Sequence, residues 1–554
     1  MPKRREIRNI LFIMYDQLRH DYLSCAGHKT LHTPHMDALA ARGMRVSNAY
    51  VQSPVCGASR MSTYTGRYVS SHGAAYNGYP LKVGEMTLGD HLRDIGVQSW
   101  LIGKTHMKAD AAGMARLGLA ADSVIGARVA ECGFDIWSRE DGLHSDGPKG
   151  HYGDEASPYN AYLRALGYLG SNPWHDFANA GDDGGDMASG WFMKNAGQAA
   201  NIEEEHSETP WLTRRAMQFM DSAQAAAPWL AHLSFIKPHW PYIVPAPYHN
   251  MYRAADVQPA QRHEAERQNP HPVLAAFQNS TIGQTFARDD VRKTVIPAYM
   301  GLIKQCDDQL GVLLAYLETT GRMDDTMIVL TSDHGDYLGD HWLGEKDLFH
   351  APSVKVPLII YDPCDAADAT RGQVCDALVE AIDLAPTFIE AKGGTVPDHI
   401  LEGRSLMPLL KGQQLDSWRD FVVSEYDYAT SPMATKLGLA PRDCRLFMVA
   451  DARYTFIHAE GGFRPMLFDR QADPQEYFDR GDSAEHAETI ALMQARLAQW
   501  SRRMSQRVTK SEAELRAQRG DAADLGLMIG IWDEADVTPE QAAAHLGPAP
   551  RRLS

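Results

Sequence analysis

The chain alternates short, continuously apolar runs with longer stretches of helical patterning. The apolar runs are Ile10–Tyr15, Ser99–Ile102, Trp229–Ile236, Met327–Leu330 and Pro357–Tyr361. Between them, apolar residues recur at helical spacing, as in Met36–Gly43 and Trp211–Ala223. Strands that are apolar throughout are buried on both faces, which is typical of parallel sheets covered by helices. The pattern therefore predicts an α/β fold in which helices sandwich a large, mostly parallel sheet.

The pattern changes from about Asp420. Three short alternating runs and one helical stretch predict a small antiparallel sheet with a helix: Phe421–Tyr426, Arg445–Val449, Tyr454–His458 and Ile490–Met504. The last segment, Thr509–Ser554, is polar and rich in alanine. We therefore expect a large α/β domain over residues 1–415, a small α+β subdomain over 416–508 and an extension over 509–554. The extension is expected to contact a second subunit in a homodimer or homotetramer.

A long segment between two of the predicted strands lacks a clear pattern. Gly103–Pro210 is rich in Gly, Asp, Asn and Trp. Long irregular segments in a compact enzyme often form the walls of a binding site. The alternative, that this segment is solvent-facing decoration, carries about equal weight.

Composition and charge narrow the classes of partner. The formal net charge of the 554 residues is −17, which argues against nucleic acid and anionic membranes because both require a basic face. The sequence contains no run of about 18 apolar residues, so it predicts no membrane-spanning helix. The N-terminal apolar run is too short for a signal sequence, so we expect a cytoplasmic protein. Seven cysteines without a CxxC pair do not predict a disulfide framework. An anionic substrate would need a local cluster of cations.

One cysteine stands out by its neighbours. Cys56 lies in Ser53–Arg67, where it is followed by small residues and by Arg60 at the start of a predicted helix. A helix N-terminus and a nearby cation would favour a reactive thiolate. A buried cysteine at a helix start is the alternative, and these residues alone favour it.

The wider sequence resembles a known family. The run Cys-x-Ala-Ser-Arg followed by Thr-Gly-Arg resembles the sulfatase signature, in which a dedicated enzyme oxidises the cysteine to formylglycine. Further segments resemble the sulfatase branch of the alkaline phosphatase superfamily in the same order: Asn9–Gln17, Thr33–Asp37, Asn48–Tyr50, Gly103–His106, Lys237–Tyr242, Ser332–Asp336, Leu467–Asp469 and Asp473–Glu476. The resemblance runs from about residue 8 to about residue 500. It implies the alkaline phosphatase-like fold, with residues 1–415 as the catalytic domain.

Two pairs of polar residues follow predicted strands. Asp16 and Gln17 follow the first strand, and Asp333 and His334 follow the strand Met327–Leu330. Parallel strands place their carboxyl ends at the same sheet edge, so both pairs can converge on one divalent cation. Oxygen ligands suit Ca²⁺, Mg²⁺ or Mn²⁺, and the imidazole favours Mn²⁺. Either pair alone could equally be an aspartate that caps the next helix. The resemblance adds the modified Cys56 as a further ligand.

The resemblance also implies roles for polar residues elsewhere. Arg60, Lys104 and Lys346 would stabilise the anionic group, and His106 and His239 would transfer protons. Taken singly, each would be an ordinary surface residue or a satisfied core group. Asn77 resembles a substrate contact of phosphonate monoester hydrolases and choline sulfatases. A metal site at His28, His32 and His35 is not expected, because Thr33 and Pro34 read as a helix start that would separate these histidines.

The resemblance implies a hydrolase that acts on sulfate esters of small molecules, of arylsulfatase type. Its nucleophile would be formylglycine at position 56, made by a formylglycine-generating enzyme and activated by the metal. The pair Lys104 and His106 resembles the residues at these motif positions in arylsulfatases. Gln17 and His334 instead resemble those of phosphonate monoester hydrolases. We therefore expect promiscuity toward phosphonate monoesters and phosphodiesters. The alternative is that the hydrolysis of phosphonate monoesters or phosphodiesters is the main activity. A non-catalytic binding protein on the same fold is a remote alternative.

Overall fold

A computed structural model of the chain describes residues 5–142, 157–170, 172–414, 417–503, 508–519 and 522–546. The chain divides into two compact units. The first comprises Met1–Val396 and Leu401–Arg503, and the second comprises Pro397–Ile400 and Met504–Ser554. The expected domain boundary at residues 415 and 416 lies outside the described residues and, like the boundary at 508, stays a prediction.

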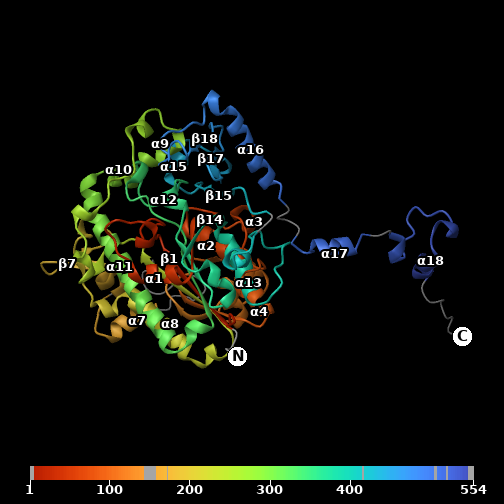
Figure 1. Cartoon of the computed structure of the whole chain (residues 1–554), viewed down its shortest axis with the longest axis horizontal. Coiled ribbons are helices and arrows are strands. Elements are labelled where there is room, and N and C mark those ends of the chain that lie inside the picture. The colour runs from red at the N-terminus through yellow and green to blue at the C-terminus, as the bar shows by residue number, and fades with distance from the viewer. Residues whose placement is uncertain are drawn as a thin grey trace. The chain divides into compact units, whose positions relative to one another are not determined.

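The first unit is built on an eight-stranded sheet (Figure 1). Its strands lie in this order: β14 (Gln373–Glu380), β2 (Met44–Tyr50), β13 (Leu358–Tyr361), β12 (Thr326–Ser332), β1 (Asn9–Asp16), β10 (Trp229–Pro238), β4 (Gln98–Gly103) and β6 (Asp135–Arg139). All neighbours are parallel except β13, which runs antiparallel to both β12 and β2. The predicted α/β class with a mostly parallel sheet is confirmed.

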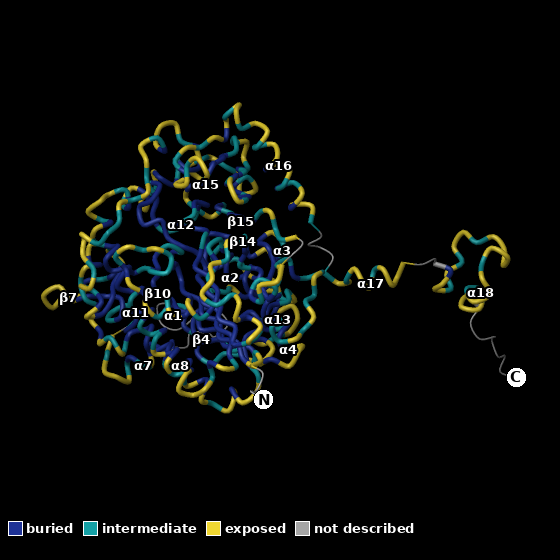
Figure 2. Tube along the Cα trace, in the orientation of Figure 1, coloured by how far each residue is buried: buried dark blue, intermediate teal, exposed yellow. Residues whose placement is uncertain are grey.

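Both faces of this sheet are buried, and the central strand β1 is accordingly apolar at nearly every position. Its alternate side chains enter two different cores: Ile10, Phe12 and Met14 on one face, and Leu11, Ile13 and Tyr15 on the other. Three helices cover the first face: α2 (Cys56–Thr65), α4 (Leu88–Asp94) and α13 (Leu384–Ala391). Three others cover the second: α1 (Pro34–Arg42), α8 (Glu208–Asp221) and α11 (Asp289–Thr319). Figure 2 shows the buried residues gathered along the central strands between these layers.

A second, antiparallel sheet completes the first unit. Its strands are β15 (Val422–Asp427), β16 (Arg445–Ala450), β17 (Tyr454–Ala459) and β18 (Met466–Asp469), in that order. Helix α16 (Ala487–Ser501) packs on it through Met493, Leu497 and Trp500. The predicted small sheet with one helix is confirmed, and β18 adds a strand that the hydrophobic pattern did not predict.

The segment Gly103–Pro210 is more ordered than its composition suggests. Its described part contains helices α5 (Ala111–Arg116), α6 (Val124–Ala130) and α7 (Pro158–Ala165), the hairpin of β7 (Ala180–Asp183) and β8 (Asp186–Ser189), and strand β6 of the main sheet. Among the described residues of the whole chain, no helix combines the length and apolar character needed to cross a membrane.

The second unit is small. Its helices are α17 (Glu512–Ala517) and α18 (Pro539–Leu546). The His545 ring nitrogen Nδ1 lies 2.7 Å from the carbonyl oxygen of Gly526, and Gln541 donates to Asp524 at 2.7 Å. These two contacts join α18 to the turn around Asp524.

Candidate active site

The main sheet brings the two predicted polar pairs to one edge. Strands β1 and β12 are parallel neighbours with Tyr15 opposite Ser332. Asp16 ends β1, and Asp333 directly follows β12, so both carboxylates leave the sheet at its carboxyl edge. Cys56 reaches the same edge from the first turn of α2. Three distant parts of the sequence therefore meet at one point.

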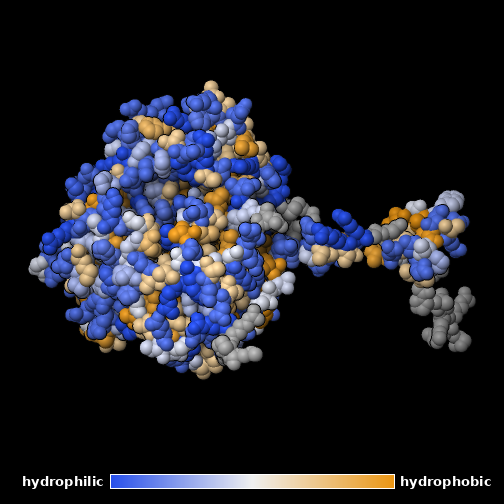
Figure 3. Space-filling view, viewed as in Figure 1, coloured by the Kyte–Doolittle hydropathy of each residue, from blue (hydrophilic) through white to orange (hydrophobic). Residues whose placement is uncertain are grey.

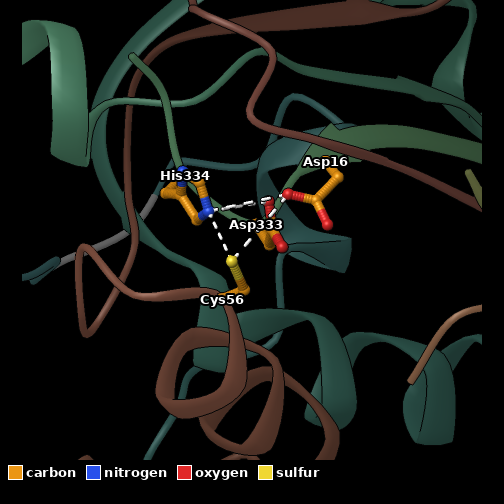
Figure 4. Close-up of side chains that lie close together, drawn as sticks. All are labelled: Asp16, Cys56, Asp333 and His334. Atoms are coloured by element: carbon orange, nitrogen blue, oxygen red, sulfur yellow. Dashed lines mark hydrogen bonds and ion pairs between the residues drawn. The ribbon is translucent and has the colours of Figure 1, made fainter. Parts of the chain in front are cut away.

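Four side chains at this point form a compact donor set (Figure 4). The ligand atoms of Asp16, Cys56, Asp333 and His334 all lie within 4.8 Å of one another, and all four residues are buried. The Cys56 sulfur lies 3.0 Å from His334 Nε2. The same nitrogen lies 3.7 Å from Asp16 Oδ1 and 3.6 Å from Asp333 Oδ1. Two carboxylates, an imidazole and the group at position 56 are compatible with one divalent cation.

Gln17, which follows Asp16, has its side-chain amide held in one orientation. Its side-chain nitrogen donates to Asp336 Oδ2 at 2.5 Å and lies 3.2 Å from the Tyr242 hydroxyl. Because the amide NH₂ faces these groups, Oε1 turns toward Lys346, whose Nζ lies 3.4 Å away. Asp336 and Tyr242 fix this orientation, and neither was given a role from the sequence although both lie in the family-like segments.

Arg60 and Lys104 hold the two carboxylates. Arg60 is fully buried and donates from Nε to Asp333 Oδ2 at 2.7 Å and from Nη1 to Ser234 Oγ at 2.7 Å. Lys104 donates to Asp16 Oδ2 at 2.5 Å. Although burial by itself raises the pKa of Asp16, the charge of Lys104 holds it below its ordinary value. Both carboxylates are thus held in place by buried cations, and the ionised form of Asp16 is favoured.

Lys346 links Cys56 to His239. Its ammonium lies 3.1 Å from the Cys56 sulfur and 3.1 Å from His239 Nε2. Burial and the charge of Lys346 lower the pKa of His239 to about 4, so this imidazole is neutral near pH 7. His239 Nδ1 lies 2.7 Å from the carbonyl oxygen of Trp240 and donates to it, which leaves Nε2 to accept from Lys346.

The unmodified Cys56 thiol is itself acidic. Burial raises the pKa of this thiol, but the charges of Lys346 and His334 lower it well below its ordinary value. Cys56 is also the first residue of α2, where the helix dipole favours a negative charge. The surroundings of position 56 therefore stabilise an anion.

His106 and Asn77 both contact the first turn of α2, at Cys56 and at Gly57 respectively. His106 hydrogen-bonds to Cys56, has a left-handed backbone with φ of 56°, and keeps a buried Nδ1 without a hydrogen-bond partner among the described residues. Asn77 Oδ1 accepts from the backbone nitrogen of Gly57 at 2.8 Å. A Cβ at Gly57 would lie 2.9 Å from that oxygen, so glycine is required for this contact.

The histidines near the start of α1 do not form a metal site together. Among the described residues, the second group of potential ligands joins His35 to Asp307 and Asp308 and contains neither His28 nor His32. Thr33 is the residue before the helix and Pro34 its first residue, as the sequence predicted. His28 instead accepts a hydrogen bond from the Leu31 backbone at 2.9 Å.

Comparison with known proteins identifies the family of the chain. The Sulfatase family model matches residues 8–394, and the model "N-sulphoglucosamine sulphohydrolase, C-terminal" matches 339–503. Fold and site together define a hydrolase of the alkaline phosphatase superfamily. The chain belongs to the sulfatase family.

Its relatives include both sulfatases and phosphonate hydrolases. The chain is 30% identical to the multifunctional alkaline phosphatase superfamily protein PehA of Trinickia caryophylli, over 89% of this chain and 95% of the relative. It is 26% identical to an arylsulfatase of Clostridium perfringens, over 87% and 92%. The phosphonate monoester hydrolase from Silicibacter pomeroyi superimposes with a TM-score of 0.77 at 28% identity, over 90% of this chain and 96% of that one.

Proposed function

We propose that this protein hydrolyses sulfate monoesters, as an arylsulfatase does, with a formylglycine at position 56 as nucleophile. The same site would accept phosphonate monoesters and phosphodiesters. One observation carries the proposal: the Cys56 side chain lies in contact with both His334 and Lys346, inside a buried donor set. The sulfur stands where the reactive oxygen of the modified residue would lie. A solely structural cysteine would not need ionised groups on every side.

A divalent cation would be held by Asp16, Gln17, Asp333 and His334, together with the group at position 56. Mn²⁺ or Ca²⁺ fits this set best, with Mg²⁺ as a third option. When bound, it supplies Lewis acidity that activates the nucleophile and polarises the ester oxygens. Arg60 and Lys104 would contribute by holding the carboxylates of Asp333 and Asp16 in place.

The remaining side chains would move protons. Lys346 holds a proton between position 56 and His239, so the pair can deliver it to the leaving oxygen as the ester bond breaks. His106, with one free ring nitrogen, would act as base at position 56 and release the product. Asn77 would fix the turn that presents position 56 and contact the substrate.

A phosphonate monoester hydrolase is the second candidate. Two solved structures of that activity, from Silicibacter pomeroyi and Agrobacterium radiobacter, superimpose with TM-scores of 0.77 and 0.75. Lys104 and His106 favour the sulfatase, since this pair resembles arylsulfatases. Relative rates on the two ester types decide between the candidates.

Aryl sulfates and aryl phosphonate monoesters are expected to react at this site at least about tenfold faster in kcat/KM than aryl phosphate monoesters, roughly 1.4 kcal/mol of transition-state preference. Arg60 and Lys104 are already paired with Asp333 and Asp16, so Lys346 and the cation supply the remaining positive charge. The ionised nucleophile at position 56 would add negative charge beside the ester, and at short range this charge disfavours a dianion more than a monoanion. Nitrophenyl esters of the three acids test this, and a preference for the phosphate monoester would replace the proposal with a phosphatase.

We also propose that the C-terminal unit contacts a second copy of the chain. It exposes large apolar side chains, with Leu525, Ile529 and Trp532 at 80, 82 and 93% exposure. Figure 3 shows hydrophobic residues at the surface of this unit. Ile529→Asp combined with Trp532→Asp is expected to lower the assembly mass measured by light scattering, whereas Glu540→Ala should not change it. A wild-type chain that is monomeric at micromolar concentration contradicts the proposal.

A further inference from the structure

A polar cavity of about 320 Å³ lies in the first unit, apart from the candidate active site. It is lined by the end of β2, by the loop that follows β1, by the segment before β13 and by the small sheet. None of the residues proposed for catalysis or metal binding lines it. Its volume is within the range of pockets that hold small organic ligands, roughly 300–1,000 Å³.

Two of its four carboxylates share one arginine. Arg19 donates to Asp21 Oδ2 at 2.7 Å and to Asp340 Oδ2 at 2.7 Å. The other oxygen of Asp340 accepts from the backbone nitrogen of Gln261 at 2.8 Å. Both carboxylates are therefore held by Arg19 and contact neither of the other two cations that line the cavity.

The other two carboxylates are also occupied. Asp451 pairs with Arg496 at 2.5 Å, and its second oxygen accepts from the backbone nitrogens of residues 453 and 454. Glu476 accepts from the hydroxyl of Thr455 and, at 3.4 Å, from the backbone nitrogen of Ala351. The acidic groups of this cavity are thus engaged in the structure of its wall.

Two cations that line the cavity, Lys355 and Arg470, are not paired with a carboxylate among the described residues. Lys355 donates to the neutral Asn48 Oδ1 at 3.0 Å. Arg470 donates to the hydroxyls of Tyr50 at 3.3 Å and Thr455 at 3.0 Å. Among the residues that the structure describes, neither cation forms an ion pair with a carboxylate within 4.0 Å. Both are half-buried and line the cavity.

These cations repel each other. Burial and the charge of Arg470 lower the pKa of Lys355 to about 8, although Glu476, Asp21 and Asp376 act in the opposite direction. An oxyanion placed between the two cations would relieve this repulsion.

We propose that this cavity binds a small molecule through an oxyanion group, a phosphate, sulfate or carboxylate, that bridges Lys355 and Arg470. Lysine supplies a point charge, and the planar guanidinium of arginine can donate two parallel hydrogen bonds to the oxygens of such a group. The proposal does not depend on the reaction catalysed at Cys56, because the two sites share no side chain.

Inorganic phosphate is the probe. Calorimetric titration of the metal-loaded enzyme should show two sites, one at the active site and one in the cavity. Lys355→Met and Arg470→Gln should each weaken the second site by at least about tenfold, since each removes a charged hydrogen-bond donor. The inhibition constant of phosphate in the hydrolysis assay, which reports the active site alone, should not change.

Two controls separate anion binding from general damage. Lys355→Arg keeps the charge and should retain the second site within about threefold. Arg453→Gln removes a charge of the small sheet that pairs with Asp469 and does not line the cavity, so binding should stay at the wild-type level. Binding of a single phosphate by the wild type overturns the proposal. So does a second site that survives both Lys355→Met and Arg470→Gln.

Discussion

Cys56→Ala is expected to lower kcat/KM by at least about a thousandfold while leaving the fold intact. The side chain is surrounded by Lys346, His334 and Asp16, and its proposed role is chemical rather than one of core packing. Removing one buried sulfur should cost about 1 kcal/mol of stability. Activity with a nitrophenyl sulfate and the thermal unfolding midpoint measure the two effects separately.

Cys444→Ala is the matched control. This cysteine is also buried and unpaired, but it lies in the small sheet region and its thiol donates to the carbonyl of Ala440. It should lose a similar amount of stability and no activity. The mass of the tryptic peptide Val46–Arg60 adds a direct test, because conversion to formylglycine replaces the thiol by an aldehyde. An active enzyme with an unmodified peptide, or an active Cys56→Ala variant, would refute the nucleophile.

Loss of Asp333 is expected to remove both the metal and the activity. Asp333 supplies one oxygen to the donor set and accepts from the Gln17 backbone nitrogen at 3.1 Å. Asp333→Ala should also destabilise the protein, by about 3–5 kcal/mol, because it removes the closer of the two carboxylates that pair with the buried Arg60. Asp333→Asn keeps an acceptor for both neighbours, so it should fold and still fail to hold stoichiometric metal. Elemental analysis of the purified variants measures this.

Asp307→Asn is the control for this experiment. Asp307 belongs to the other group of potential ligands among the described residues, with His35 and Asp308. If the cation binds at the candidate active site, this variant keeps its metal and its activity. Stoichiometric metal in Asp333→Asn together with loss in Asp307→Asn would place the cation elsewhere and overturn the proposed ligand set.

The strands that the sequence predicted are those buried on both faces. β1, β10 and β12 carry apolar side chains into two cores at once, so their sequences are apolar throughout. β14 was missed because it is an edge strand, where several positions are exposed. The reversed direction of β13 was also not predictable, because an apolar run reads the same in parallel and antiparallel pairing.

Some features of the site could be predicted from the sequence and others could not, for a related reason. Side chains at strand ends and in family-like segments could be proposed from their positions in the sequence, as for Asp16, Asp333 and Cys56. The orientation of Gln17 depends on Asp336 and Tyr242, which reach it from other elements. Such contacts join residues more than 200 positions apart, and no local pattern encodes them.

The sequence by itself determined the fold class, the family and which residues could carry the chemistry, because burial and strand ends leave local patterns. Only the tertiary structure decided how the charges combine. Arg60 and Lys104 hold the carboxylates, whereas Lys346 faces position 56 and His239. It also decided that Lys355 and Arg470 line one cavity and, within the described part of the chain, form no ion pair with a carboxylate. Charge pairing depends on distances across the fold, and these exist only once the chain has packed.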